Sequence, residues 1–361
     1  MRVFAVRSPE GPLFRASTRT SIGKPTEPVP PSAGAGWRVF THSPFTHSLS
    51  YPHSPGFPAL TASGKKPKAA LQSGIIVASF GRRFSVELVD GALVTCVTRG
   101  RRTDFACGDR ATIAITARDQ GVIESVHPRA SLFYRSDIRR EKLIAANVTQ
   151  IVIVLAAAPA FHQELLDRCL AAAGDAGIGA LLVLNKMDLP AANAALQALE
   201  LYRALGYKVL PLAAKIDPKP LRPRLAGHTS VLVGQSGTGK STIINRLVPD
   251  AAARVGRLSQ ALGGGRHTTT HARLYHLDAV SHIIDSPGLQ EFGLQHIGPT
   301  GLAHCFVEFQ KYLGQCKFND CRHLTEPGCA VTTAVERGEI DSRRIDSYRK
   351  LVTQLLRKVK R

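Results

Sequence analysis

Hydrophobic and polar positions divide the chain into four regions of different character. Residues 1–70 sustain no apolar period and are rich in Pro, Ser and Thr, which is typical of a disordered basic extension. Residues 71–140 carry short alternating runs between Gly and Asp turns, which predict a small all-β, OB-like barrel. Residues 141–300 alternate apolar strands with helical segments, and residues 301–361 are helical and basic around a cysteine cluster.

The third region predicts an α/β domain. Its strands are apolar throughout, which indicates a mostly parallel sheet with helices on both faces. Strands are expected at Gln150–Leu155, Ala180–Leu184, Lys208–Leu212, Ser230–Val233, Leu274–Leu277 and His282–Ile284. Helices are expected at Phe161–Ala173 and Ala192–Leu205, with a proline-rich linker at Pro218–Pro223.

Charge points to a polyanionic partner. The chain has 361 residues with 47 Lys+Arg against 27 Asp+Glu, a formal net charge of +20. Lys and Arg bind nucleic acid by neutralising phosphates, so RNA or DNA is the expected ligand. Arg99, Arg101 and Arg102 lie at turns of the expected barrel, where OB-type barrels commonly contact oligonucleotides. No apolar run reaches the about 18 residues of a membrane span, so we expect no membrane partner. We also expect the protein to be a monomer.

A glycine-rich loop supplies the strongest chemical signal. Gly234–Ser241 fits the pattern G-x-x-x-x-G-K-[ST] between an apolar strand and a helix that starts near Thr242. Backbone amides of such a loop and the helix N-terminus point at phosphate oxygens. Lys240 is expected to neutralise the terminal phosphates as a catalytic residue, and Ser241 to ligate Mg²⁺. The expected phosphate-binding residues are Gly234, Gln235, Ser236, Gly237, Thr238, Gly239, Lys240, Ser241 and Thr242.

A second motif selects the base. Asn185-Lys186-Met187-Asp188 directly follows an apolar strand. The Asp188 carboxylate can accept two hydrogen bonds from guanine, whereas adenine offers no such donor pair. Lys186 is expected to lie over the base and Asn185 to brace neighbouring loops. The ligand is therefore predicted to be GTP or GDP.

Two further segments complete the expected site. Asp285 ends a strand before Ser-Pro-Gly288, which suits water-mediated Mg²⁺ coordination by the carboxylate and a γ-phosphate contact by the Gly288 amide. A glycine hinge, Gly263–Gly265, precedes Arg266-His267-Thr268-Thr269-Thr270 and predicts a switch segment. One of the three threonines, with Thr269 as the candidate, is expected to ligate Mg²⁺ when GTP is bound. The order is unusual, because Asn185 precedes Gly234, which indicates a circularly permuted GTPase held closed by flanking domains.

The cysteine pattern predicts a metal site. Cys316-x4-Cys321-x-His323-x5-Cys329 offers three thiolates and one imidazole, a closed tetrahedral set that favours one structural Zn²⁺. Buried or disulfide-paired cysteines are the alternative. The odd count of seven cysteines favours a reducing compartment.

Together these motifs resemble the ribosome small subunit-dependent GTPase A (YjeQ/YloQ) family. The resemblance covers about residue 71 to the C-terminus and includes Phe306-Val-Glu-Phe309. It implies a bacterial cytoplasmic factor that binds rRNA late in small-subunit maturation and hydrolyses GTP slowly unless the subunit accelerates it. Leu289 follows Gly288 where Ras-like enzymes carry Gln, and leucine cannot orient water. The resemblance offers His267 as the assisting catalytic residue.

Several alternatives remain open at the level of sequence. An RNA-binding assembly scaffold with nucleotide as a structural ligand is one rival, and an ATP-driven P-loop protein is another. The usual Ser-Ala-Lys-like base loop is reduced to Ala213-Ala214-Lys215. Residues 1–70 are open to three interpretations, which are a tail, an organelle transit peptide or a misassigned start.

Overall fold

The computed structural model describes residues 70–100, 104–136, 141–249, 251, 272–286, 294 and 297–359. The extension expected over residues 1–70 therefore lies outside the described part, except for residue 70. The described residues belong to one compact unit.

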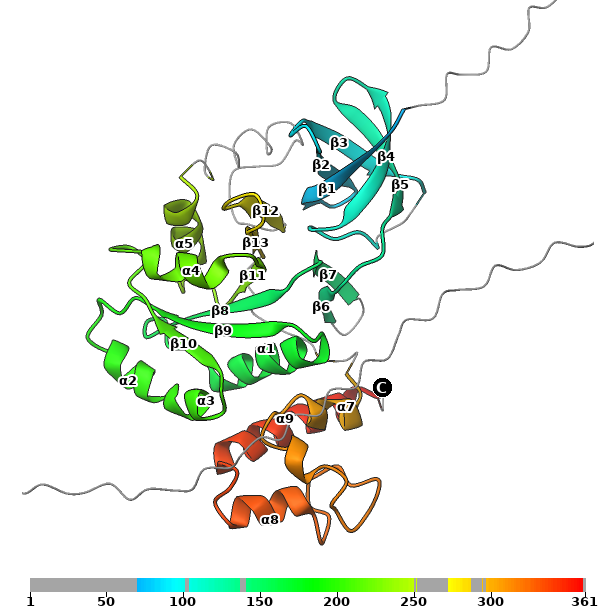
Figure 1. The fold of residues 1–361 in the computed structure, drawn as a ribbon. Helices are drawn as coiled ribbons and strands as arrows, with labels where there is room; N and C mark the ends of the chain where they lie inside the picture. Colours follow the sequence, from blue (N-terminus) through cyan, green and yellow to red (C-terminus); the bar gives the residue numbers. More distant parts are fainter. Residues whose placement is uncertain are drawn as a thin grey trace, which may run out of the picture. The chain divides into compact units, whose positions relative to one another are not determined.

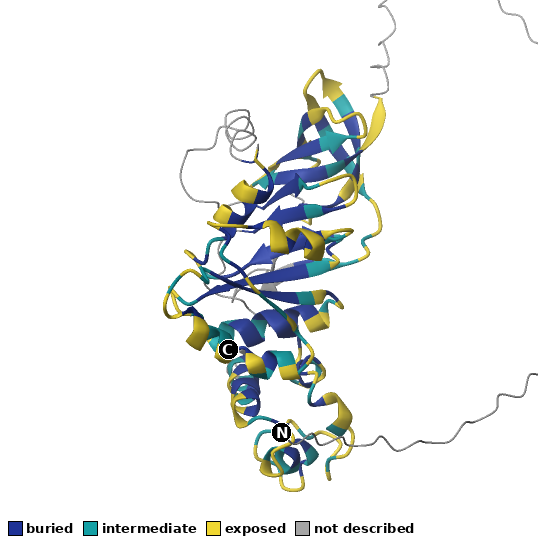
Figure 2. Ribbon diagram, turned by 60° about the vertical axis from the view of Figure 1, so that its left-hand side comes forward, coloured by how far each residue is buried: buried dark blue, intermediate teal, exposed yellow. Residues whose placement is uncertain are grey.

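The first part of the fold is a closed β-barrel, as the alternating pattern predicted. Its strands are β1 (Leu71–Phe80), β2 (Arg83–Leu88), β3 (Leu93–Thr98), β4 (Arg110–Ala117) and β5 (Gln120–Val126). The barrel closes because β1 pairs with both β2 and β4, while β3 and β5 pair in parallel. Alternate positions such as Ile76, Phe84, Val86 and Ile113 fill the interior. Figure 2 shows buried positions along the barrel strands.

A hairpin leads from the barrel to the next domain. It consists of β6 (Leu132–Ser136) and β7 (Glu141–Ala146) and spans the boundary that the sequence placed at residue 140. Asn147 follows it with φ 56°, accepts a hydrogen bond from the Ala130 amide and donates one to the Gly108 carbonyl. The side chain of one asparagine thus ties the hairpin to the barrel.

The second part is a parallel sheet with one antiparallel strand at its edge, which confirms the predicted α/β class. The strand order is β10-β9-β8-β11-β13-β12, and β12 alone runs antiparallel to its neighbour within this set. The bounds are β8 (Gln150–Ala156), β9 (Gly179–Asn185), β10 (Lys208–Pro211), β11 (Thr229–Val233), β12 (Arg273–His276) and β13 (His282–Asp285).

Helices cover both faces of this sheet (Figure 1). They are α1 (Gln163–Asp175), α2 (Ala192–Gln197), α3 (Glu200–Ala204), η1 (Lys219–Leu221), α4 (Arg222–Leu225) and α5 (Lys240–Leu247). Ile151 and Ile153 of β8 face the core that includes α1, whereas Val152 and Val154 face the core with α4 and α5. Alternation along one apolar strand therefore builds two cores.

Two local predictions were wrong. The expected helix Ala192–Leu205 is broken into α2 and α3, because the amide of Leu199 bonds the carbonyl of Leu196, three residues back. The proline-rich segment expected to be a linker forms η1 and α4. It buries Leu221 and Leu225 in the core, which gives the segment enough apolar contact to order it.

The C-terminal part packs directly on α1. It contains α7 (Pro299–His304), η2 (Gln310–Tyr312), α8 (Ala330–Glu336) and α9 (Ser342–Val359). Its apolar side chains, such as Phe306 and Tyr348, belong to the same core cluster as Leu166 of α1. Of the helices described, none is both long enough and apolar enough to cross a membrane.

A buried charge network lies in this interface. The Arg344 side chain of α9 is 2% exposed and forms ion pairs with Asp167 of α1 and, at 2.5 Å, with Glu308. The Tyr202 hydroxyl donates to Asp167 at 2.8 Å, and the Arg344 guanidinium lies 4.5 Å from the Phe306 ring centroid. Removing one partner of such a network leaves the others buried without compensation.

We expect Arg344→Met to lower the free energy of unfolding by about 3–5 kcal/mol, because Asp167 and Glu308 would keep their buried charges without a cation. Urea denaturation followed by circular dichroism measures the change. Arg343→Met is the control, since that side chain is 52% exposed in its pair with Asp341 and should cost less than about 1 kcal/mol. Equal losses in the two variants would contradict the assignment.

Candidate functional site

The predicted nucleotide-binding motifs meet at one edge of the sheet. The phosphate loop follows β11, Asn185 ends β9 and Asp285 ends β13. These three strands are parallel, so their carboxyl ends lie at the same edge. Ligands of open α/β sheets bind at this edge.

Two glycines allow the loop to pack against its neighbours. Gly234 has φ 147°, and a Cβ there would lie 2.2 Å from the Val154 carbonyl oxygen of β8. Gly239 has φ 99°, and a Cβ there would lie 2.3 Å from Asn185 Nδ2. Both positions require glycine for conformation and for space, so the loop lies tightly against β8 and β9.

Lys240 is buried at the start of α5. Its Nζ donates to the carbonyl oxygens of Gly234 at 2.7 Å and Gln235 at 2.8 Å. Burial lowers the pKa of Lys240, and the charge of Asp285 opposes this shift. Burial also raises the pKa of Asp285 to about 6, against the opposing charges of Lys240 and Arg273. One cation and one carboxylate thus face the same buried region at the loop.

Other loop residues present a surface to solvent. Ser236, Gly237, Ser241 and Thr242 are exposed. Thr238 is buried, and its hydroxyl donates to the Gln235 carbonyl at 3.0 Å. The exposed hydroxyl of Ser241 stands at the N-terminus of α5, where a phosphate-bound cation is held in P-loop proteins.

Asn185 joins two loops. Its Nδ2 donates to the Thr238 carbonyl at 2.9 Å, and its Oδ1 accepts from the Ala214 amide at 3.0 Å. The buried side-chain amide of Asn185 therefore holds both the phosphate loop and the Ala213–Lys215 segment in place. The Lys186 Nζ donates to the Ala158 carbonyl at 2.6 Å, and Asp188 is exposed in the next turn.

Some predicted site residues lie outside the described residues. They are the switch residues His267, Thr268, Thr269 and Thr270, together with Gly288 and Leu289. The strands next to these two segments, β12 and β13, are described and pair with each other. The start of β12 and the end of β13, where the two segments join the sheet, therefore lie side by side.

A second cluster lies in the C-terminal part. Cys316, Cys321, His323 and Cys329 place their ligand atoms within 4.8 Å of one another. The His323 Nδ1 lies 3.6, 3.6 and 3.4 Å from the three sulfurs, in that chain order. Tetrahedral zinc with ordinary Zn–S and Zn–N bonds requires about 3.6 Å between these atoms. The four residues therefore fit a metal ion of this size and can hold one.

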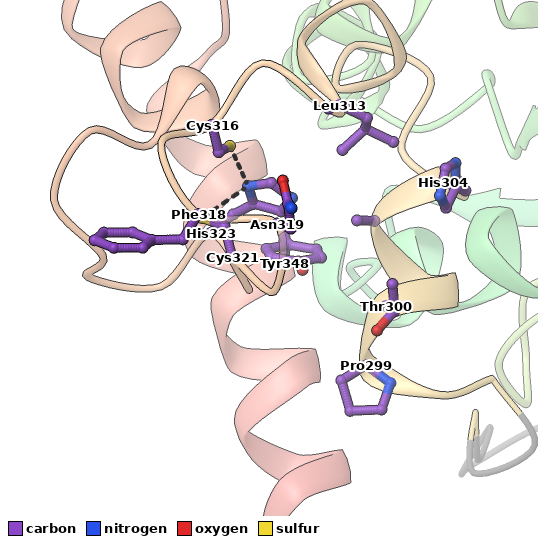
Figure 3. A pocket seen from close by; sticks show the side chains of 12 residues that line it. Pro299, Thr300, His304, Leu313, Cys316, Phe318, Asn319, Cys321, His323 and Tyr348 are labelled. Atoms are coloured by element: carbon purple, nitrogen blue, oxygen red, sulfur yellow. Dashed lines mark hydrogen bonds between the residues drawn. The ribbon is translucent and has the colours of Figure 1, made fainter.

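The surroundings hold this cluster in place. His323 packs edge-on against Phe309 and at a tilt against Tyr348. Burial lowers the pKa of His323, which favours the neutral imidazole that binds metals. The Cys329 sulfur accepts from the Thr332 amide at the start of α8. A cavity of about 390 Å³ adjoins the cluster, with Thr300 and His304 of α7 on its other side (Figure 3).

Sequence reasoning missed the buried charges around these sites. Arg273 begins β12 directly opposite Asp285, and Arg344 joins Asp167 to Glu308. A charged residue at the start of a largely buried strand is a signal for the first. The second had no local signal, because its partners lie 177 and 36 residues away in the chain.

Comparison with known proteins agrees with this geometry. The family model of the RsgA GTPase matches residues 126–295. The small ribosomal subunit biogenesis GTPase RsgA of Nitrosospira multiformis is 54% identical over 303 residues, covering 84% of this chain and 95% of the relative. The crystal structure of YjeQ from Thermotoga maritima superposes with a TM-score of 0.62 at 30% identity, covering 80% of this chain and 99% of that one.

A second solved structure is also that of a circularly permuted GTPase. YloQ, described as a circularly permuted GTPase, superposes with a TM-score of 0.59 at 26% identity and covers 82% of this chain and 99% of that one. The permuted order, the closed barrel and the Cys–His cluster all agree with the resemblance seen in the sequence. The chain belongs to the RsgA GTPase family and is a GTPase with circularly permuted motifs.

Proposed function

We propose that this GTPase acts in the biogenesis of the small ribosomal subunit, in the bacterial cytoplasm, and hydrolyses GTP as it leaves the maturing particle. The observation that supports this most strongly is the permuted site at one sheet edge, joined to a closed barrel of the kind that binds oligonucleotides. The relative that shares 54% of the aligned residues carries small-subunit biogenesis in its name.

The proposed site assigns a role to each motif. Lys240 and the loop amides hold the triphosphate, Ser241 and Thr269 ligate Mg²⁺, and Asp285 orients its water shell. The bound ion neutralises charge that develops on the phosphates. Asp188 accepts hydrogen bonds from guanine, and Asn185 fixes the distance between the base loop and the phosphate loop.

Rapid GTP hydrolysis in this site requires a contribution from a partner of the protein. Leu289 supplies no polar group for the attacking water, and His267 of the predicted switch segment is the candidate that the family resemblance offers. We infer that contact with the small subunit positions the groups that hydrolyse GTP, so that hydrolysis follows only when the protein has bound the particle. GTP hydrolysis then determines when the protein leaves the maturing subunit.

The remaining parts give the proposal its partners. The net charge of +20 suits ribosomal RNA, and the barrel turns near Arg99 are proposed as one contact surface. The Cys–His cluster is proposed to hold one structural Zn²⁺, since all of its positions come from protein and none is left for substrate.

We expect small ribosomal subunits to raise GTP hydrolysis at least about tenfold over the intrinsic rate. Phosphate release with and without purified subunits measures this effect. Binding to subunits should weaken at least about tenfold between about 50 and about 200 mM salt, because phosphate contacts release counterions. Large subunits are the control, and a flat rate with both particles would favour the scaffold alternative.

We expect Asp188→Asn to weaken GTP binding about 100-fold and to favour xanthosine triphosphate, whose carbonyl replaces the guanine amine and accepts from an amide. Calorimetry with both nucleotides and with ATP measures the preference. Glu200→Gln is the matched control, because that carboxylate is exposed and pairs with Arg203 on α3. Unchanged selectivity in Asp188→Asn, or equal affinity of the unmutated protein for ATP, would overturn the assignment.

We expect the purified chain to carry about one zinc ion, and Cys321→Ser to lose it. Metal analysis gives the stoichiometry, and hydrogen exchange should show faster exchange after residue 306 while GDP affinity stays within about threefold. Cys305→Ser is the control, since this buried thiol contacts the Gly301 carbonyl outside the cluster. Loss of GDP binding together with zinc would refute the separation of the two sites.

A further inference from the structure

Strand β12 contacts the barrel at both of its ends. The barrel strand β1 pairs with β12 at Ala78 and Arg273, and the Arg273 guanidinium lies 5.3 Å from the ring centroid of Phe80. At the other end His276 Nε2 lies 3.0 Å from Glu87 Oε2 in β2. Movement of the barrel therefore reaches β12 through the β1–β12 pairing and through two side-chain contacts.

The same two residues of β12 stand opposite the two ends of β13. Arg273 pairs with Asp285, and His276 pairs with His282, whose Nδ1 atoms lie 2.9 Å apart. Side chains of opposed residues project from the same face of a sheet. The charge of Arg273 accordingly lowers the pKa of Asp285, against the larger effect of burial.

Arg273 is an unusual choice for this place. It is 8% exposed, and its Nη1 is buried with no hydrogen-bond partner among the residues that the structure describes. Burying a guanidinium with an unmade hydrogen bond costs free energy. The face of Phe80 and the carboxylate of Asp285 offset that cost, and they belong to the barrel and to the nucleotide site.

The pairing of Arg273 with Asp285 matters for the nucleotide site because β12 and β13 each adjoin one of its predicted segments in the chain. Two residues separate Thr270, the last of the predicted switch threonines, from the start of β12, and β13 ends directly before Ser286-Pro-Gly288. A shift of β12 against β13 thus displaces the anchors of both segments that sense the γ-phosphate. Arg273 stands at the nucleotide-proximal end of this strand pair.

We propose that Arg273 is a positioning residue through which the barrel, on binding RNA of the subunit, sets the place of Asp285 and so the rate of GTP hydrolysis. This inference rests on the proposed function, because it takes the small subunit as the ligand of the barrel. The contact of Phe80 with Arg273 and the pairing of Arg273 with Asp285 couple the barrel to the nucleotide site.

The test is a double-mutant cycle on the stimulation factor, the ratio of hydrolysis with and without small subunits. The variants are Phe80→Leu, Arg273→Met and the double variant, with Arg273→Lys as the conservative change. Arg222→Met is the matched control, because Arg222 donates to the Leu277 carbonyl at the β12–β13 turn and comes from α4, outside the barrel. GDP calorimetry reports that each variant is folded.

We expect each single variant to lower the stimulation factor about tenfold, and the double variant to fall no further than Arg273→Met alone. Arg273→Lys should keep part of the stimulation, and Arg222→Met all of it within about twofold. Intrinsic hydrolysis of Phe80→Leu should stay within about twofold, which a general loss of stability would not allow.

Two other results would overturn the inference. Stimulation that survives in Phe80→Leu and Arg273→Met, or losses that multiply in the double variant, would show that the contact is structural only. Absence of stimulation in the unmutated protein would instead overturn the proposed function, and this inference with it. The two failures are thereby distinguished.

Discussion

The parallel pairing of β8 with both β9 and β11 is the constraint on which the nucleotide site depends. It places Val154 beside Gly234 and the end of β9 beside the phosphate loop, although the loop lies about 50 residues further along the chain. A strand buried on both faces permits no slip in register, because every side chain would change core. The separation between the base motif and the phosphate motif is therefore set by the sheet and is insensitive to motif order.

Circular permutation changes which parts of the chain hold the loops of the nucleotide site together. In this chain the base motif precedes the phosphate loop, and Asn185 supplies the direct link, with one hydrogen bond to each neighbouring loop. The barrel contacts one edge strand, β12, and the C-terminal part packs on α1 at the other side of the sheet. Both flanking parts thus contact the α/β domain that carries the nucleotide motifs, the barrel through β12 and the C-terminal part through α1.

Buried charge marks both of these interfaces. Arg344 joins α9 to α1 and to Glu308, with every partner nearly inaccessible to solvent, which fixes one packing geometry. Arg273 is less completely paired within the described residues and faces a carboxylate of the nucleotide site. A fully paired network suits a permanent contact, whereas an incompletely paired cation suits a contact that changes with the bound state.

The sequence alone determined the elements whose signal is local. Apolar runs predicted β8 and β9, glycine spacing predicted the phosphate loop, and ligand spacing predicted the Cys–His cluster, because each depends on residues a few positions apart. Only the tertiary structure decided the rest. The order in Pro218–Pro223 comes from burial of Leu221. The contacts of Arg344 with Asp167 and of Arg273 with Phe80 join elements that are distant in the chain, and such long-range pairing leaves no pattern in neighbouring residues.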